Sequence, residues 1–182
     1  MIVVGIDPSL SCTGIVTADD WGGIVTGRAK TQTPPTQTLR ARRRRTRTAL
    51  ARILDQLPQR VDLFVVEAPS PRSQFGSHND RVGLYWLLVD QLLARADVAE
   101  VLPKTRAKYA TGNGNADKAA VKTAMRAAFP HVPVPDDNVA DALALALMGL
   151  RHLGSPLDGE LTPKHLDAMD APSWPTPEGA TA

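Results

Sequence analysis

Residues 2–7 read Ile-Val-Val-Gly-Ile-Asp and are followed at once by Pro8 and Ser9. Such β-branched side chains favour an extended strand, and the proline after Asp7 ends it, so this carboxylate is expected at the tip of a rigid element. Two further β-prone runs, 13–18 and 23–28, follow after short segments rich in Pro, Ser, Asp and Gly. This spacing predicts an antiparallel meander of three strands at the start of the fold.

Two amphipathic helices are predicted next, over 38–57 and 77–96, because apolar residues recur there at helical spacing. Between them, residues 61–67 (VDLFVVE) form a continuous apolar run that is typical of a strand buried on both faces. Downstream we expect a short strand over 98–102, a short helix over 103–110, and long helices over 116–129 and 136–153. The order of the main elements, βββαβαβαα, predicts an α/β fold with a mixed five-stranded sheet flanked by helices.

The composition describes one globular domain. The chain has 182 residues, 43% of them hydrophobic, which is enough for one well-packed core and too little for two. We place that domain at residues 1–153 and expect residues 154–182, rich in Pro, Asp, Thr and Ala, to form an acidic flexible tail. The single cysteine excludes an intrachain disulfide, and the four histidines lie too far apart for a zinc site. We find no signal-peptide pattern and no stretch of membrane-spanning length, so a cytoplasmic protein without membrane contact is expected.

Positive charge is concentrated in the expected domain. The whole chain carries +2, but residues 155–182 hold five acidic side chains against one lysine, which leaves +6 for residues 1–154. Six arginines lie within eight residues: Arg40, Arg42, Arg43, Arg44, Arg45 and Arg47. We predict that this cluster, with Arg43 and Arg44 at its centre, contacts a nucleic-acid backbone; the alternative is a solvated helix face. Aromatic residues make up only 4% of the chain, which disfavours a module that binds single strands by stacking.

Three acidic residues are candidates for a metal site. Asp7 and Glu67 each end a predicted strand, and they converge at one sheet edge if those strands are neighbours. Asp141 lies on the inward stripe of the last helix, which begins with Asn138. Inward carboxylates without a basic neighbour in sequence repel one another unless cations lie between them, and Mg²⁺ prefers such oxygen ligands. A pair of ions could stabilise the attacking and leaving oxygens of phosphodiester cleavage. For each acid alone, a helix cap or a salt bridge is the alternative.

A glycine-rich segment, residues 111–118 (TGNGNADK), runs into the third long helix, with Asn115 expected as its N-cap. The segment is not a phosphate-binding loop of the GxxxxGK[ST] type, so nucleoside triphosphate binding gains no support. Lys118 falls in the first helical turn, where it opposes the helix dipole; this favours a phosphate partner, although a solvated lysine is equally compatible with the spacing. Further candidates for DNA contact are Asn113 in the segment and, ahead of it, Lys104 and Lys108.

Four blocks of the sequence together resemble one family. Residues 5–9 (GIDPS), 65–67 (VVE), 111–118 and 140–144 (ADALA) look like the motifs of RuvC-type Holliday junction resolvases, in the family's order and approximate spacing. The chain is most similar to the compact versions that bacteriophages carry, and the resemblance spans residues 1–153. It implies a ribonuclease H-like fold and a homodimer. It also implies nicking of two opposed strands at a four-way DNA junction, dependent on two Mg²⁺ or Mn²⁺ ions per active site.

The resemblance also implies roles for individual residues. Asp7, Glu67 and Asp141 match the metal-binding catalytic acids, and Lys118 matches an active-site contact to phosphate or the transition state. The family usually has a fourth ligand three residues before the last acid, often Asp; here that position holds Asn138, whose amide oxygen can ligate without adding charge. Asp137 is the second candidate for this ligand.

One departure from the family widens the expected substrate range. Residues 68–71 (APSP) replace a stretch in which bacterial members carry an aromatic residue that unstacks bases, so activity on flaps and Y-forks stays open. Phe75 is the best-placed residue to take the role of that aromatic. The dimer is expected to form through helix 77–96, whose core face includes Trp86 and whose opposite face carries Leu84 and Leu87.

Three other functions each share a feature with this sequence. A branched-DNA-binding protein with weak catalysis on the same fold is favoured by Asn138. Nucleases of ribosomal RNA processing that resemble YqgF share the opening Asp motif but not the glycine-rich segment with Lys118. Sugar-kinase or actin-like ATPases share the Gly-Ile-Asp turn but need roughly twice this length.

Overall fold

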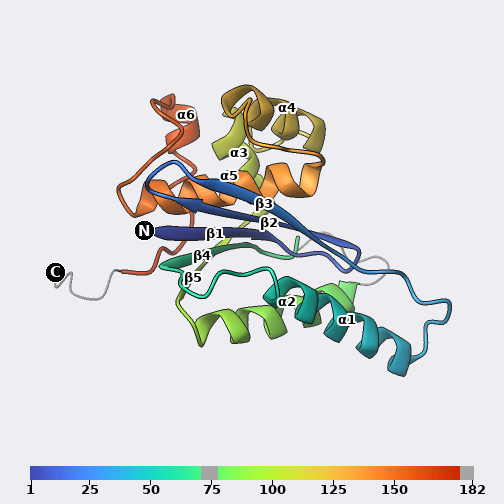
Figure 1. Cartoon of the computed structure of the whole chain (residues 1–182). Coiled ribbons are helices and arrows are strands. Elements are labelled where there is room, and N and C mark those ends of the chain that lie inside the picture. Colours follow the sequence, from blue (N-terminus) through green and yellow to red (C-terminus); the bar gives the residue numbers. More distant parts are fainter. Residues whose placement is uncertain (71–77, 177–182) are drawn as a thin grey trace.

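A mixed five-stranded sheet runs through the middle of the molecule, in the order β3-β2-β1-β4-β5 (Figure 1). The computed structural model describes residues 1–70 and 78–176. The strands are β1 (Ile2–Asp7), β2 (Cys12–Asp19), β3 (Ile24–Lys30), β4 (Leu63–Glu67) and β5 (Asp97–Val101). The first three form an antiparallel meander, and β4 and β5 run parallel to β1. The predicted fold class is therefore confirmed.

Helices cover both faces of the sheet (Figure 1). On one face lie α1 (Leu39–Leu54) and α2 (His78–Leu93); on the other lies α5 (Asp137–His152), with α3 (Pro103–Thr111), α4 (Lys118–Ala128) and α6 (Pro163–Leu166) outside it. Helix α3 is the short helix predicted over 103–110. Helix α6 was not predicted, because one turn in a Pro-rich segment has no apolar periodicity to find. No helix in the described ranges combines the length and apolarity needed to cross a membrane.

The strands sort their side chains between two cores. On β1, Val3 joins the core under α5, whereas Val4 joins the core under α1 and α2, and β4 divides in the same way. Because strand side chains alternate with a period of two, Asp7 and Glu67 both fall on the α5 side. The parallel register of β1 and β4 then places these two acids next to each other.

Helix α5 lies directly on the backbone of the sheet. A Cβ atom at Gly5 would lie 2.1 Å from the carbonyl oxygen of Ala142, and one at Gly14 would lie 2.0 Å from that of Asn138. Both distances are far below van der Waals contact, so only glycine allows the helix to pack at this depth. The first turns of α5, including Asp141, are thereby held over the end of β1.

The buried face of α2 differs from the predicted one. Leu84, expected on the outer side, is 1% exposed, whereas Trp86, expected in the core, is 63% exposed beside Leu87 at 46%. Leu88 replaces Trp86 in the core, since Leu84, Leu88 and Leu92 recur every four residues and form one buried row. The exposed large apolar side chains of α2 are therefore the neighbouring Trp86 and Leu87 and, at its last residue, Leu93, which was also expected in the core.

Residues 155–176 pack against the domain, which differs from the flexible tail that we predicted from residue 154. Asp158 pairs with Arg151 of α5, Ala168 is buried, and Trp174 stacks on His152 with ring centroids 4.6 Å apart. The composition of this segment misled the prediction because its few apolar side chains add to the existing core under α5 instead of forming one of their own. Two of its acidic side chains, Asp158 and Asp167, meanwhile pair with Arg151 and Lys108 of the domain.

Candidate active site

Asp7, Glu67 and Asp141 come together at the end of the sheet where β1 and β4 finish and α5 begins. Asp7 is 8% exposed and Asp141 is fully buried. Burial raises the pKa of Asp7 well above its ordinary value, and the negative charges of Glu67 and Asp141 raise it further. Mutual repulsion of this kind requires the carboxylates to be close, so the structure brings together the three acids that the strand ends suggested.

Arg106 of α3 lies among these acids. Its Nε donates a hydrogen bond to Glu67 Oε2 at 2.8 Å, and its Nη1 forms an ion pair with Asp141 Oδ1 at 2.8 Å. The side chain is only 4% exposed. Burial lowers the pKa of Arg106, but the charges of Glu67 and Asp141 outweigh it and raise the pKa above the ordinary value. The guanidinium is thus a built-in counter-cation for two of the three acids.

In the sequence, Arg106 belongs to the same basic stretch as Lys104 and Lys108, which favours a place on an electropositive rim and not among the acids. Its signal is the pattern of α3, in which Arg106 shares one buried face with Ala107, Tyr109 and Ala110. Arg106 lies three and four residues before Tyr109 and Ala110, on the same side of the helix, so its side chain is directed inward with theirs. A buried guanidinium requires an acidic partner. That pattern could have linked α3 to the acids before the structure was known.

Asp141 has the most unusual environment of the three acids. Burial raises its pKa to about 7, although Arg106 acts in the opposite direction. Apart from the ion pair with Arg106, neither carboxylate oxygen has a hydrogen-bond partner in the part of the chain that the structure describes. Buried carboxylate oxygens without donors are costly unless a cation satisfies them.

These donors suit a hard divalent cation in their chemistry, because Mg²⁺ and Mn²⁺ prefer carboxylate and amide oxygens. Within residues 1–70 and 78–176, however, no three His, Cys, Asp or Glu side chains are already arranged to hold an ion. Arg106 supplies the positive charge instead. The donor set therefore fits the metal that the resemblance implies, with Arg106 as the group that competes for Glu67 and Asp141.

Lys118 is also directed toward the acids. It is the first residue of α4, capped by Asp117, whose side chain accepts a hydrogen bond from Ala120 N; Asn115 is therefore not the N-cap that we predicted. Burial lowers the pKa of Lys118, but its hydrogen bond to Asp137 and the charge of Asp7 raise it overall. Lys118 Nζ lies 2.9 Å from Asp137 Oδ2.

The two candidates for a fourth ligand differ in their surroundings. The hydrogen bond from Lys118 lowers the pKa of Asp137 and keeps its carboxylate ionised. Asn138 lies beside the Cys12 thiol and lowers the pKa of that group, although burial raises the pKa overall. Asp137 would have to leave Lys118 to reach a metal ion.

A small cavity of about 150 Å³ opens beside the acids. Asp7 and Glu67 line it together with Tyr85 and Pro103. Tyr85 donates a hydrogen bond to Glu100, which fixes its ring at the cavity wall. The cavity gives the acids access to a group of about the size of a phosphate.

Of the other residues proposed for DNA contact, some are exposed and others already have partners within the protein. Arg43, Arg44 and Lys104 are exposed, as a phosphate contact requires. Lys108 Nζ lies 3.1 Å from Asp167, so this lysine is paired with the C-terminal segment. Asn113 is exposed, and its side chain accepts a hydrogen bond from Asn115 N within the glycine-rich segment. Phe75 lies outside the described residues.

Comparisons with known proteins agree with this architecture. No protein-family model matches the sequence, and no curated protein matches it. Among solved structures, RuvC of Thermus thermophilus aligns with a TM-score of 0.58 and 22% identity, covering 85% of this chain and 98% of that chain. The same protein in complex with a Holliday junction substrate gives a TM-score of 0.58 over 97% of its length. The yeast mitochondrial Holliday junction resolvase Ydc2 aligns with a TM-score of 0.46 and 11% identity over 79% of this chain and 75% of its own. The likeness to T. thermophilus RuvC shows that this chain has the same ribonuclease H-like fold.

Proposed function

We propose that this protein is a metal-dependent endodeoxyribonuclease that resolves Holliday junctions or related branched DNA. One observation carries the proposal: three acids from β1, β4 and α5 converge, and apart from the ion pair of Oδ1 with Arg106 the carboxylate of the buried Asp141 has no hydrogen-bond donor among the described residues. The fold shared with T. thermophilus RuvC, which has been solved with a Holliday junction, supports the choice of branched DNA as substrate.

Asp7, Glu67 and Asp141 would hold two Mg²⁺ or Mn²⁺ ions, with Asn138, or failing that Asp137, as the fourth ligand. When bound, such ions lower the pKa of water and stabilise the leaving 3′ oxygen of an in-line phosphodiester cleavage. The protein supplies the rest. Asp7 is fixed at the end of a buried strand, which orients its carboxylate.

Lys118 and Arg106 supply positive charge on either side of the acids. The hydrogen bond to Asp137 holds the Lys118 ammonium at the edge of the site, where it can bind a phosphate oxygen as negative charge develops. Arg106 balances the charge of Glu67 and Asp141, so the acids stay assembled before an ion arrives. Release of either carboxylate by Arg106 would free it for the metal.

Two such sites in a homodimer would nick two opposed strands of a four-way junction. We assign the dimer contact to the exposed Trp86 and Leu87 on α2, because apolar side chains of this size are seldom left in water together.

A compact nuclease of this kind is similar to those of bacteriophages and would act in the cytoplasm of the host during DNA recombination or repair.

The test is cleavage of an end-labelled immobile four-way junction beside a Y-fork and a plain duplex, with Mg²⁺, with Mn²⁺ and with neither. Paired nicks at the junction that need metal and disappear in Asp7→Asn are expected. Cutting of every branched form would make the protein a general debranching nuclease. Cutting that persists in Asp7→Asn would refute the assigned site.

A second function is favoured by the engaged side chains around the acids. Arg106 pairs with two of the acids, and Asn138 adds no negative charge as a ligand, so a branched-DNA-binding protein with weak catalysis is the alternative. It predicts tight junction binding in either metal with no strand cut.

A further inference from the structure

A basic groove lies between the end of β3 and the first half of α1, on the opposite face of the sheet from α5. It measures about 340 Å³ and is bounded on one side by residues 31–35 and on the other by α1. Three arginines of α1 line it: Arg44, Arg45 and Arg52. No acidic side chain lines the groove.

The arginines of this groove are not neutralised by carboxylates in the described ranges. Arg42, one residue before Arg43, shows the contrast, since it makes two hydrogen bonds to Asp80 at 2.8 and 2.6 Å and ties α1 to α2. Arg45 lies close enough to Asp80 to lower the pKa of that carboxyl but forms no ion pair with it. Arg52 donates a hydrogen bond to the backbone carbonyl of Lys30, which leaves its full charge at the groove.

Two buried polar atoms of the groove lack partners. Arg45 Nε and Thr31 Oγ1 are both inaccessible to solvent, and neither has a hydrogen-bond partner among the described residues. A buried donor without an acceptor costs about 1–3 kcal/mol, so such groups are normally satisfied by something. Because solvent does not reach either atom, an anion in the groove would instead meet the exposed Arg44 and the unneutralised charges of Arg45 and Arg52.

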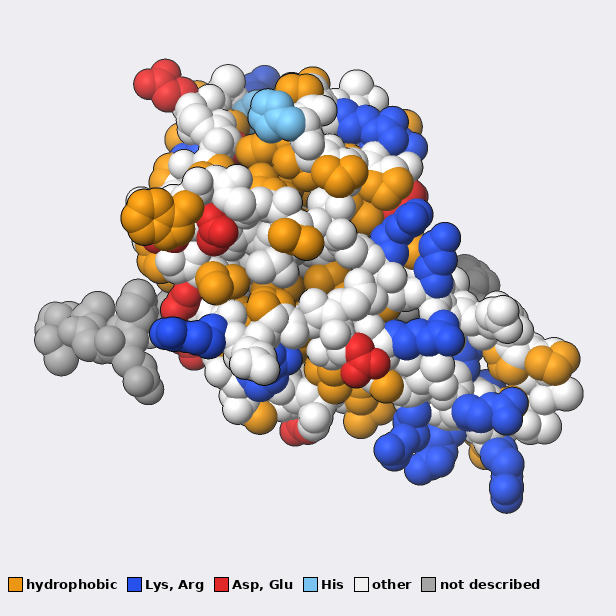
Figure 2. Space-filling model, viewed as in Figure 1, with side chains coloured by type: hydrophobic (Ala, Val, Ile, Leu, Met, Phe, Trp, Pro, Cys, Tyr) orange, Lys and Arg blue, Asp and Glu red, His pale blue; other side chains and the backbone are white. Residues whose placement is uncertain are grey.

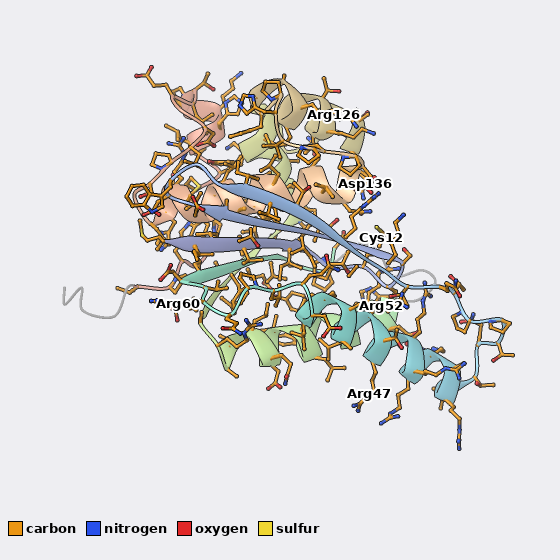
Figure 3. The ribbon with its side chains drawn as sticks, viewed as in Figure 1. Cys12, Arg47, Arg52, Arg60, Arg126 and Asp136 are labelled. Atoms are coloured by element: carbon orange, nitrogen blue, oxygen red, sulfur yellow. The ribbon has the colours of Figure 1, made fainter. Side chains whose placement is uncertain are left out.

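The groove faces the same end of the molecule as the acids. Arg52 lies at the end that also carries Cys12, which follows the turn after β1, and Asp136, which caps α5, whereas Arg60 lies at the opposite end (Figure 3). Arg47 points away from the sheet on the outer side of α1 (Figure 3). Lys and Arg side chains gather over α1 on this side of the surface (Figure 2).

We propose that this groove binds the phosphodiester backbone of a DNA arm that extends from the active site. Guanidinium groups bind phosphate oxygens through two parallel hydrogen bonds, and Thr hydroxyls are common additional donors to the backbone. An acidic protein segment is less well matched, because the groove offers no large apolar pocket in which a partner side chain could anchor. The inference rests on the proposed function only for the identity of the anion.

The test measures binding without cleavage. Fluorescence anisotropy of a labelled four-way junction and a labelled plain duplex, in EDTA and over a series of KCl concentrations, gives both affinity and salt dependence. Each lost phosphate contact lowers the slope of log K against log salt by about 0.9. We expect that loss for Arg44→Gln and for Arg45→Gln, and no change for the matched control Arg60→Gln.

Arg45→Lys separates charge from geometry, because it keeps the charge but loses the planar fork and Nε. We expect it to bind DNA more weakly than the wild type. If Arg45→Gln is poorly folded by circular dichroism, Arg44→Gln decides, since Arg44 is exposed.

The outcomes separate this inference from the proposed function. Equal effects of the Arg44, Arg45 and Arg60 substitutions on the slope would overturn the groove while leaving DNA binding intact. No binding of either DNA by the wild type would overturn the proposed function itself. A glutamate-rich peptide that binds the wild type but not the Arg44→Gln, Arg45→Gln double variant, with DNA binding unchanged in that variant, would assign the groove to an acidic protein.

Discussion

Asp141→Asn is expected to stabilise the metal-free protein while it removes a predicted metal ligand. The substitution keeps the size of the side chain but makes the neutral state permanent. Because the pKa of Asp141 lies near 7 in the fold and near 3.8 when the chain is unfolded, the folded state holds a proton that the unfolded state has released between these values. The free energy of unfolding of the wild type therefore falls as pH rises from about 4 to about 7.

The size of the effect follows from the two pKa values. Each pKa unit corresponds to about 1.4 kcal/mol, so ionising Asp141 above about pH 7 costs the fold about 4 kcal/mol. The attraction of Arg106 is already contained in the pKa of Asp141, since it acts against the rise, so the loss of that contact needs no separate deduction. The net gain for the asparagine is about 4 kcal/mol at about pH 8, or a rise in Tm of about 8–16 °C for a chain of this length.

Thermal unfolding in EDTA, followed by circular dichroism at about pH 5 and about pH 8, measures this difference. At about pH 5 the folded wild type holds the Asp141 proton but the unfolded chain has largely released it, so the advantage of the asparagine should shrink to about 1.6 kcal/mol, about a third of its value at about pH 8. Asp62→Asn, at an exposed acid that caps the start of β1, is a control for the loss of one negative charge. A lower Tm for Asp141→Asn at about pH 8, or the same rise at both pH values, would refute the reasoning.

Three further outcomes are expected. Arg106→Met should destabilise the metal-free protein by about 3–5 kcal/mol, since it leaves two acids without their counter-charge. Mn²⁺ should restore part of the lost Tm and should bind to this variant more tightly than to the wild type by calorimetry. Unchanged Mn²⁺ affinity would contradict competition by Arg106. Leu87→Glu should give monomers in sedimentation velocity, and an unaltered dimer would remove α2 from the interface. Asp158→Ala should leave Arg151 unpaired and detach residues 155–176, so limited proteolysis should cut there first; resistance equal to the wild type would show that apolar contacts alone hold the segment.

The sheet and its connections were predictable because they depend on local signals. A run of β-branched residues ended by the proline after Asp7 defines β1, an uninterrupted apolar run at residues 63–66 defines β4, and two parallel strands joined by a helix are normally neighbours. The orientation of α2 was not predictable in the same way. Apolar residues occur on nearly all sides of this helix, and only contact with α1 and β4 selects Leu84 over Trp86 for the core.

The acids of the site were predictable for the same reason as the strands, since strand ends fix where Asp7 and Glu67 project. Arg106 was not found because its partners lie 39 and 35 residues away in sequence, and a single arginine near two lysines is typical of a basic surface. Only the packing of α3 against the sheet edge shows that this arginine is directed inward. The partner of Asp137 was missed similarly, because α4 and α5 meet only in the folded chain.

The two glycines under α5, Gly5 and Gly14, make the relative positions of the acids rigid and sensitive to substitution. Where side chains separate a helix from a sheet, a substitution can be absorbed by a change of rotamer, and the backbone stays in place. At Gly5 and Gly14 the helix touches main chain, so there is nothing between the layers to adjust. Any added atom there would displace Asp141 relative to Asp7 by about its own size. Two residues without side chains thus set the spacing on which the chemistry of the acids would depend.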